Sequence, residues 1–322
     1  MSVFDKDDVR IFSGRANPEL AIKIANCLEI PMSQTHVSRF SNDNLFVQLG
    51  QSVRGRNVYI VQSLTPPVSD HLVELLMMLD IAKSAAAKEI HAIVPYFSYA
   101  RSDKKDLPRI SITARLIADL LKTSGATQFM TMTLHSPQVH GFFSIPADPL
   151  TARFKIADYV RPRNYDPQKT IVVAPDLGNA KQAARFASLL NLSVASGEKT
   201  RHSDEKVAIS RILLRQIEGF ETALVYDDEI ATGGTMAELC HLLVEGGIKE
   251  IVLICTHGLF LGKAIDRFQA IPEIVEIITT DTVMLPPEKK LPNMTILSVG
   301  DVFCEAIKNN YLHRSIEEIF EG

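Results

Sequence analysis

The sequence predicts an α/β protein of two tandem domains, each a mainly parallel sheet flanked by helices and related to the other by duplication. Three observations lead to this prediction. Short β-branched runs alternate with longer amphipathic stretches, a pattern typical of parallel sheets covered by helices. The 322 residues exceed what one hydrophobic core usually serves. The units Asn57 to Tyr99 and Glu221 to Phe260 each run through strand, loop, helix and strand.

The elements follow from hydrophobic periodicity, since strands are short apolar runs and helices carry an apolar stripe. In residues 70–86 the stripe is formed by Leu72, Leu75, Leu76, Leu79 and Ala82, which indicates one buried face. The expected strands are 9–13, 46–49, 58–62, 90–94, 128–133, 171–175, 222–226, 250–256, 275–279 and 294–298. The expected helices are 18–28, 70–86, 111–124, 149–160, 178–189, 234–246, 262–269 and 301–309. We place the domain boundary between Pro146 and Leu150, which gives domains 1–148 and 149–300 and a C-terminal helix in 301–322 that packs back on the first domain.

Charge and cysteine content narrow the class of protein. The net charge of −4 disfavours a general binder of nucleic acid or of membrane surfaces. The longest stretch without Lys, Arg, Asp or Glu, from Gln128 to Ala147, is too polar to span a bilayer. No leader pattern precedes the first strand, so a cytoplasmic location is expected. Four widely spaced cysteines are expected to be buried thiols in a reducing compartment, neither zinc ligands nor disulfides.

The most informative loop follows strand 222–226. Asp227 and Asp228 come directly after the apolar run, and Thr232-Gly233-Gly234-Thr235 then opens a helix. Glycines let successive N–H groups face an anion, and the helix N-terminus adds positive charge. Two carboxylates beside a phosphate cradle suit the vicinal hydroxyls of a ribose 5-phosphate; an acidic turn before an ordinary helix is the alternative. The equivalent loop of the first half, Ser63 to Pro67, has neither acids nor glycine.

Further segments resemble the ribose-phosphate pyrophosphokinase (PRPP synthetase) family, which has the type I phosphoribosyltransferase fold. The resemblance covers nearly the whole chain, in the family's order. Besides the Asp227–Thr235 loop, it rests on Arg39-Phe40-Ser41, Val53-Arg54-Gly55, Ile93–Arg101 with Asp103, Leu134-His135, Gly141-Phe142-Phe143, Ala174–Gly178 and Glu198-Lys199-Thr200-Arg201.

The resemblance implies transfer of the β,γ-diphosphoryl group of ATP to the 1-hydroxyl of ribose 5-phosphate, with Mg²⁺, giving PRPP and AMP. It assigns ribose 5-phosphate to Asp227, Asp228 and the loop Ala231, Thr232, Gly233, Gly234, Thr235. It also implies self-association, as a homohexamer built from dimers, with an ATP site shared between subunits. Neither nucleic acid nor membrane is an expected partner.

The same resemblance assigns the remaining site residues. Lys199 and Arg201, in the polar stretch Ser193–Lys206, are expected to be catalytic cations on a mobile lid, since diphosphoryl transfer needs positive charge. Arg101, Ser102 and Asp103 are expected to grip ATP, an exposed charged turn being the alternative.

His135 and Asp176 each follow a strand, where open α/β sheets collect ligands. The resemblance gives both residues to Mg²⁺, and His135 to ATP as well. Imidazole is a poor Mg²⁺ ligand, so binding of His135 through ATP, or a role as a core histidine, stays open. Asp176-Leu177-Gly178 is expected to form a short turn that feeds a helix N-terminus able to cradle pyrophosphate.

Three departures from the family pattern affect the expected site. Phe40-Ser41-Asn42-Asp43-Asn44 stands where the family commonly has F-S-D-G-E, so Phe40, Asn42, Asp43 and Asn44 are expected to contact ATP with an altered nucleotide preference. Thr133 stands where many members have Asp, and Ala231 replaces an acidic residue. The alternatives are a phosphoribosyltransferase, a catalytically weak regulatory homologue, and a pyrophosphokinase with another nucleotide donor or sugar acceptor.

Overall fold

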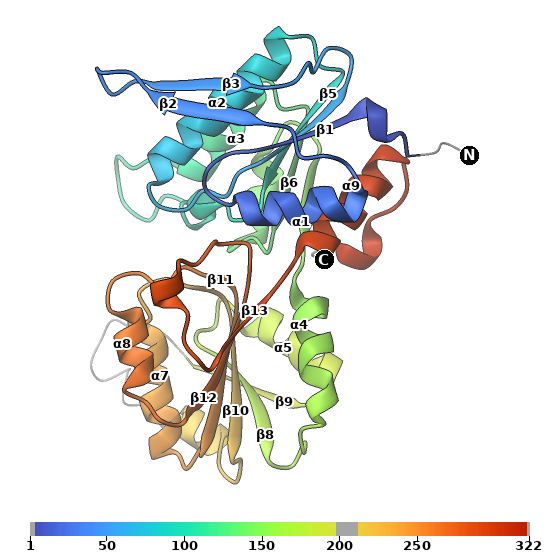
Figure 1. Ribbon diagram of the computed structural model, residues 1–322. Helices are drawn as coiled ribbons and strands as arrows, with labels where there is room; N and C mark the ends of the chain where they lie inside the picture. The colour runs from blue at the N-terminus through green and yellow to red at the C-terminus, as the bar shows by residue number, and fades with distance from the viewer. Residues whose placement is uncertain (1–3, 198–211, 321–322) are drawn as a thin grey trace. The chain divides into compact units, whose positions relative to one another are not determined.

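The computed structural model describes residues 4–197 and 212–320, and the chain forms two compact units (Figure 1). Unit 1 comprises residues 1–151, 282–284 and 298–322, and unit 2 comprises residues 152–281 and 285–297. Within the described ranges, no helix has both the length and the apolar character needed to cross a membrane. Short 3₁₀ turns lie at Lys6–Asp8, Ser98–Arg101, Pro137–Phe142, Arg161–Arg163, Pro287–Lys289 and Glu317–Ile319.

Unit 1 is built on a parallel sheet in the order β1-β4-β5-β6-β7. Helices α2 and α3 pack together on one face, whereas α1 and α9 pack together on the other (Figure 1). A separate antiparallel hairpin, β2–β3, projects from the unit. The bounds are β1 Val9–Ser13, α1 Pro18–Leu28, β2 Thr35–Arg39, β3 Leu45–Leu49, β4 Asn57–Val61, α2 Val68–Ser84, β5 Glu89–Val94, α3 Thr113–Ser124, β6 Gln128–Met132, β7 Ala147–Leu150 and α9 Gly300–Tyr311.

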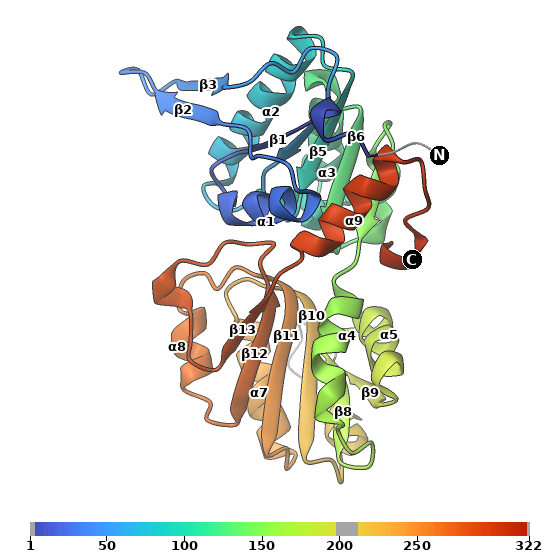
Figure 2. The same cartoon turned by 45° about the vertical axis from the view of Figure 1, so that its right-hand side comes forward.

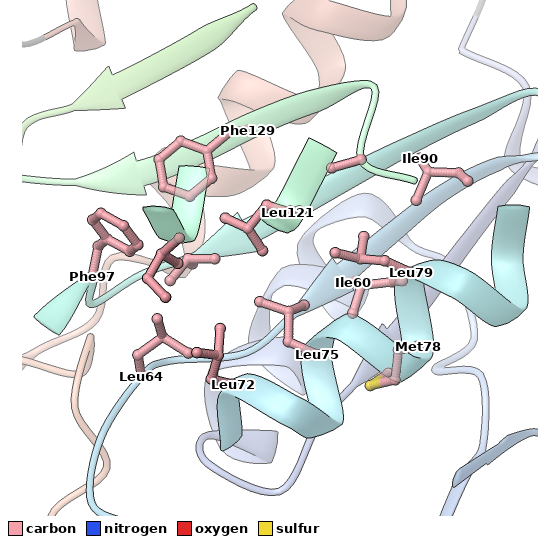
Figure 3. Close-up of a cluster of buried hydrophobic side chains, with 14 of the residues drawn as sticks. Ile60, Leu64, Leu72, Leu75, Met78, Leu79, Ile90, Phe97, Leu121 and Phe129 are labelled. Carbon is pink, nitrogen blue, oxygen red and sulfur yellow. The ribbon is translucent and has the colours of Figure 1, made fainter. Parts of the chain in front are cut away.

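The core of unit 1 lies between the sheet and helices α2 and α3 (Figure 3). Leu72, Leu75 and Leu79 point into this core, as the apolar stripe of the sequence predicts, and Leu76 lies at its edge. The same face of α2 also buries Met78. Side chains from β4, β5 and β6 complete the cluster, so the strands are fixed against one layer of helices.

Unit 2 is built on a second parallel sheet, in the order β13-β12-β11-β10-β8-β9. Helices α4 and α5 pack on one face, and α7 and α8 on the other (Figure 2). The bounds are α4 Arg153–Val160, β8 Thr170–Ala174, α5 Ala180–Leu190, β9 Ser193–Ser196, β10 Thr222–Ile230, α7 Gly234–Glu245, β11 Glu250–Gly258, α8 Ala264–Gln269, β12 Ile274–Thr280 and β13 Met294–Leu297.

The two sheets have the same connectivity. In chain order, β1, β4, β5, β6 and β7 of unit 1 occupy the positions that β8, β10, β11, β12 and β13 occupy in unit 2. Even the edge strand β9 has a counterpart, because Ser33 forms a parallel bridge to Phe12 of β1. The predicted class, two parallel α/β sheets flanked by helices, is therefore confirmed. The shared strand order also makes the β4 and β10 loops structurally equivalent.

The structure corrects three expected elements and adds strands that were not expected. Residues 147–150 form an edge strand, so the helix expected from 149 begins at Arg153; Pro149 is tolerated in β7 because an edge strand has one free side. Strand β10 continues four residues past Tyr226 and includes both aspartates. Strands β2 and β9 were not expected. The start of the expected lid, Ser193–Ser196, is strand β9, which pairs with β8 in the sheet.

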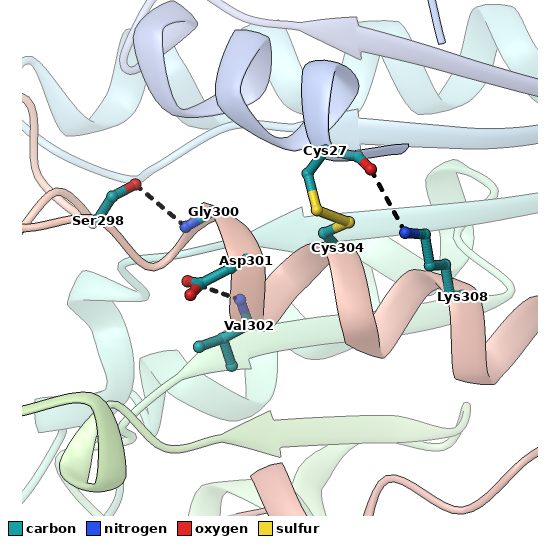
Figure 4. Close-up of a disulfide and its surroundings, with 7 residues drawn as sticks. All are labelled: Cys27, Ser298, Gly300, Asp301, Val302, Cys304 and Lys308. Atoms are coloured by element: carbon teal, nitrogen blue, oxygen red, sulfur yellow. Dashed lines mark hydrogen bonds between the residues drawn. A yellow bond between two sulfur atoms is a disulfide. The ribbon is translucent and has the colours of Figure 1, made fainter. Parts of the chain in front are cut away.

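The prediction of four thiols is wrong for two of the cysteines. Cys27 of α1 and Cys304 of α9 form a disulfide, with 2.13 Å between the sulfur atoms (Figure 4). The Nζ atom of Lys308, one turn further along α9, donates to the carbonyl of Cys27 at 3.4 Å. Sequence spacing could not show this pair, because 277 residues separate two cysteines that only the packing of α1 on α9 brings together. Cys240 and Cys255 are buried thiols, as expected.

We expect the unfolded chain to expose two reactive thiols without reductant. Alkylation of the denatured, unreduced protein should therefore modify Cys240 and Cys255 only, and prior reduction should add Cys27 and Cys304. Intact-protein mass spectrometry counts the added groups. Four modified cysteines before reduction would contradict the disulfide.

Candidate functional site

Three carboxylates of unit 2 lie at the carboxyl end of its sheet. Asp176 lies two residues after β8, and Asp227 and Asp228 lie in the last part of the neighbouring strand β10. Asn179 joins the two segments: its backbone N–H donates to Oδ1 of Asp176 at 3.1 Å, and its side-chain Nδ2 donates to the Tyr226 carbonyl at 2.8 Å. The buried amide of Asn179 therefore holds the β8 loop against β10.

These carboxylates share one electrostatic environment. Burial raises the pKa of Asp227 well above its usual value, and the negative charges of Asp228 and Asp176 raise it further. The Asp228 backbone N–H, which donates to Oδ1 of Asp227 at 2.9 Å, opposes this rise. The ionised form of Asp227 is therefore destabilised in the folded protein. Hydroxyl donors or a cation bound at this position would stabilise it.

The predicted phosphate cradle begins helix α7. Gly233 has a left-handed backbone, with φ of 69°, and a Cβ atom there would lie 2.7 Å from Cζ of Phe268. Only glycine fits this conformation and this contact. Thr232 and Thr235 are exposed on either side of the buried Gly233, and Gly234 is the first residue of α7. The loop therefore presents hydroxyls and a helix N-terminus to solvent, as an anion site requires.

Hydrogen bonds from α8 and its preceding loop to two backbone carbonyls hold the cradle in place. Leu261 donates its N–H to the carbonyl of Ala231 at 2.8 Å. Arg267 of α8 donates from Nη1 to the carbonyl of Thr232 at 2.5 Å. Both bonds are accepted by carbonyl groups of the loop and so fix its backbone conformation. Ala231 thus contributes backbone rather than charge.

The Asp176-Leu177-Gly178 segment is the short turn that the sequence predicts. Ala180, the first residue of α5, donates its N–H to the Leu177 carbonyl at 3.3 Å, and α5 begins immediately after Asn179. Leu177 is more than half exposed although it is apolar. The turn thus leads from the end of β8 into a helix N-terminus, the arrangement that favours a bound anion.

The equivalent loop of unit 1, residues 63–67, is partly buried and bonded to other segments of that unit. Ser63 and Leu64 are fully buried, and a cis bond joins Pro66 to Pro67. The Ser63 hydroxyl donates to the carbonyl of Thr282 at 2.6 Å, and the Leu64 N–H donates to the carbonyl of Tyr96 at 2.8 Å. The buried part of this loop is therefore bonded to other segments of unit 1, and it offers neither the acidic pair nor the glycines of the second copy.

The proposed nucleotide-contacting segment of unit 1 is the tip of the β2–β3 hairpin. Phe40 is 57% exposed and packs edge-on against Phe46, with 5.7 Å between ring centroids. Asn42 and Asn44 lie beside it, exposed, and Asn42 Oδ1 accepts the N–H of Asn44 at 3.3 Å. Asp43 lies in the left-handed region, with φ of 68°. The exposed ring of Phe40 is available to stack on a base.

The segment after β5 forms a 3₁₀ turn that ends at Arg101, which is exposed. Ser102 ties this turn to α3. Its hydroxyl accepts the N–H of Thr113 at 3.2 Å and donates to the carbonyl of Ser111 at 3.4 Å. Asp103 is half-buried next to it. Arg101 and Asp103 therefore sit on a loop that the Ser102 hydroxyl anchors.

We expect Ser102→Ala to lower stability and to weaken ATP binding, because the loop that carries Arg101 and Asp103 loses its anchor. The hydroxyl acts as a cap for the first turn of α3, and loss of such a cap costs about 0.5–2 kcal/mol of unfolding free energy. Urea unfolding measures this loss, and the KM for ATP should increase with it. An increased KM with unchanged unfolding would instead make the hydroxyl an ATP contact.

His135 and Asp176 belong to different units. His135 follows β6 in unit 1 and is exposed, so the alternative that it is a core histidine is wrong. Thr133, two residues before it, has φ of 40° and donates its N–H to the carbonyl of Leu150 at 2.8 Å. In the described part of the chain, no group of three or more His, Cys, Asp or Glu side chains could hold a metal ion by itself.

The expected catalytic cations Lys199 and Arg201 lie outside the described residues. Conversely, sequence reasoning missed Asn179, Arg267 and Phe268. Asn179 resembles an ordinary helix-capping residue, and Arg267 and Phe268 lie on another element, more than 30 residues from the loop they support. A charged residue late in α8 carried no signal that would link it to Thr232.

The chain is similar to known proteins over nearly its full length. Residues 9–125 match the model of the N-terminal domain of ribose phosphate pyrophosphokinase. Ribose-phosphate pyrophosphokinases of Deinococcus radiodurans and Rhodopirellula baltica are each 40% identical over 313 residues, covering 96% and 97% of this chain and 97% and 98% of theirs. The crystal structure of phosphoribosylpyrophosphate synthetase from Mycobacterium smegmatis superimposes with a TM-score of 0.87 at 34% identity, covering 95% of this chain and 99% of that one.

Proposed function

The chain belongs to the ribose-phosphate pyrophosphokinase family and makes PRPP, and we propose that ATP donates the diphosphoryl group to ribose 5-phosphate bound at the β10–α7 loop of unit 2. The single observation that carries this binding site is the buried carboxylate pair placed next to a glycine cradle at a helix N-terminus. The glycine cradle and the helix N-terminus suit the 5-phosphate, and the carboxylates can accept hydrogen bonds from the ribose hydroxyls.

We assign the sugar phosphate to residues of unit 2. Asp227 and Asp228 accept hydrogen bonds from ribose hydroxyls, and Thr232, Gly233, Gly234 and Thr235 surround the 5-phosphate. Ala231 contributes only backbone. The Asp176-Leu177-Gly178 turn, at the next helix N-terminus along the sheet, receives the diphosphoryl group.

We assign the nucleotide to residues of unit 1. Phe40 stacks on the base, and the turn Asn42-Asp43-Asn44 contacts base and ribose. Arg101, Ser102 and Asp103 bind the nucleotide from the loop that the Ser102 hydroxyl anchors. His135 reaches the phosphates. Lys199 and Arg201 supply positive charge that stabilises the negative charge of the diphosphoryl group during its transfer. Two amides at positions 42 and 44 make nucleotide preference the least constrained property of this site.

Mg²⁺ fits this reaction as a metal that arrives with the nucleotide. Magnesium in phosphoryl-transfer sites is held by one or two carboxylates together with substrate phosphates, whereas His135 alone is a poor ligand. The described residues form no complete protein cage, and Asp176 offers the carboxylate that such a site needs. When bound, the ion neutralises charge on the transferring diphosphoryl group.

A homohexamer built from dimers and a cytoplasmic location complete the proposal. Mass measurement by light scattering tests the assembly. The disulfide between Cys27 and Cys304 is unusual for a cytoplasmic protein, where thiols are generally kept reduced. The state of these cysteines in protein taken directly from cells therefore tests the location.

The decisive experiment measures AMP release by the purified chain against a panel of nucleotides and sugar phosphates, with and without Mg²⁺. We expect AMP and PRPP in equal amounts from ATP and ribose 5-phosphate. A regulatory homologue would release no AMP by itself, and an enzyme with another donor or acceptor would prefer a different pair. A phosphoribosyltransferase would consume PRPP instead of producing it.

A further inference from the structure

The tip of the β2–β3 hairpin is held by a single arginine. Arg39, the last residue of β2, donates from Nη1 to both the carbonyl and Oδ1 of Asp43, each at 2.8 Å. Its other nitrogen, Nη2, donates to Oδ2 of Asp70 at 2.5 Å. The guanidinium thus joins the hairpin tip to the first turn of α2, and its planar fork can reach both partners at once.

The turn that Arg39 holds is the one that presents the candidate nucleotide contacts. Asp43 donates its N–H to the carbonyl of Phe40, and Phe40 donates its N–H to the carbonyl of Asn44, both at 2.9 Å. The base of the hairpin is fixed by Val47, which is buried in the core of unit 1. The tip has no residue buried in that core, so the bonds to Arg39 add to the two backbone bonds and to the Phe40–Phe46 contact in restricting its conformations.

Asp43 is unusual at this position. Its φ of 68° is a conformation that glycine adopts freely and aspartate tolerates, and the family commonly has glycine there. This chain therefore accepts some backbone strain in exchange for a carboxylate that meets Arg39. The carboxylate is 85% exposed, and the Arg39 and Asp70 side chains are 33% and 38% exposed. Ion pairs this exposed add little to global stability.

We propose that Arg39, Asp43 and Asp70 are positioning residues that set nucleotide affinity by preorganising the hairpin tip, an inference that rests on the proposed nucleotide site. In this arrangement Asp43 acts through Arg39, in place of the direct ATP contact that the family resemblance implies for it, and Arg39 does not bind the phosphates of ATP. The hydrogen bond to Asp70 raises the pKa of Arg39, and the charges of Asp43 and Asp70 raise it further. Ordering the tip before ATP arrives removes a conformational cost that binding would otherwise carry.

The test compares Arg39→Lys, Asp43→Gly and Asp70→Asn by steady-state kinetics. Lysine keeps the charge but loses the fork, and glycine keeps the backbone conformation but loses the carboxylate. We expect each variant to raise the KM for ATP about 3- to 10-fold, with kcat and the KM for ribose 5-phosphate unchanged. Arg39→Lys combined with Asp43→Gly should raise it no more than the stronger single change, because both remove the same interaction.

The sign of the effect separates positioning from direct binding. If Arg39 bound the phosphates of ATP, Asp43→Gly and Asp70→Asn would release its charge and lower the KM, which would overturn the proposal. Arg115→Lys is the matched control, because Arg115 pairs with Asp119 in a similar i, i+4 arrangement on exposed α3. Its KM for ATP should equal that of the parent, and an increase there would make the effect of Arg39→Lys nonspecific.

Phe40→Ala distinguishes a failure of the positioning role from a failure of the nucleotide site itself. An increased KM for ATP in Phe40→Ala, with no change in Arg39→Lys or Asp43→Gly, would refute the positioning role alone. An unchanged KM in Phe40→Ala would refute the nucleotide site at the hairpin tip and the positioning role with it. Thermal unfolding of all variants should match the parent closely, since the ion pairs are exposed.

Discussion

Gly233→Ala should lower kcat/KM for ribose 5-phosphate by about 10²-fold, the scale of a misplacement near 1 Å in an active site. The new Cβ would lie 2.7 Å from Cζ of Phe268 and 3.3 Å from Cβ of Ala264. Phe268 is buried and packs edge-on against Phe260, so the loop rather than the ring must move. Displacing the loop moves the N–H groups that would face the phosphate. Initial rates at varied ribose 5-phosphate measure the loss.

Gly55→Ala is the control for backbone strain. Gly55 has φ of 65°, almost the same as Gly233, but a Cβ atom there would meet nothing within 4 Å. Both variants bear a left-handed alanine, which costs about 1–2 kcal/mol. Only Gly233→Ala should change sugar-phosphate kinetics. A similar loss in Gly55→Ala would show that reduced stability, not loop geometry, causes the effect.

Sequence patterns predict the central elements of the fold well, because buried parallel strands and amphipathic helices have strong periodicity. Helix α1 and strand β1 lie where they were expected, and the stripe of α2 faces the core. The errors fall where tertiary context outweighs local pattern. Strand β7 contains Pro149 and exists only as an edge partner of β6, and the polar strand β9 is held by its pairing with β8.

The residues of the candidate site also fall into two groups, those that a local sequence pattern identifies and those that only tertiary structure reveals. Residues that act through their own backbone conformation, such as Gly233, can be recognised from short segments with a characteristic spacing. Residues that support them from another element cannot. Arg267 reaches Thr232 from α8, and Asn179 joins the β8 loop to β10 only because the two strands are neighbours in the sheet. The disulfide between Cys27 and Cys304 has the same origin, since helix packing alone makes the pair.

The free energy of unfolding should depend on pH through the ionisation of Asp227. Its pKa in the folded protein is raised, so the folded state binds a proton more tightly than the unfolded chain, in which an aspartate has a pKa near 3.8. The stabilisation from this group is complete below the unfolded pKa, and it is lost as pH rises through the folded value. Above that value, the ionised carboxylate is a net cost to folding, caused by burial and by the charges of Asp228 and Asp176.

Asp227→Asn should therefore make the protein more stable at pH values above the raised folded pKa of Asp227, and it should make the enzyme less active. The amide removes the buried charge, and relief of about 1 kcal/mol would raise Tm by roughly 2–4 °C in a unit of this size. The amide also replaces a charged acceptor for a ribose hydroxyl, which should lower kcat/KM for ribose 5-phosphate by roughly 5- to 150-fold, corresponding to about 1–3 kcal/mol. Calorimetry across pH and initial-rate kinetics measure the two effects.

Two comparisons decide whether the carboxylate of Asp227 contacts the sugar. Deoxyribose 5-phosphate lacks one of the hydroxyls that the Asp227 carboxylate would bind. Its kcat/KM should therefore fall less in Asp227→Asn than the kcat/KM for ribose 5-phosphate. Asp158→Asn, which removes an exposed carboxylate on α4 that pairs with Arg161, should change neither Tm nor sugar use appreciably. Equal losses for the two sugars would refute the hydrogen bond between carboxylate and hydroxyl. A Tm in Asp227→Asn that never exceeds that of the parent, even on the alkaline side of the raised folded pKa of Asp227, would refute the cost of the buried ionised carboxylate.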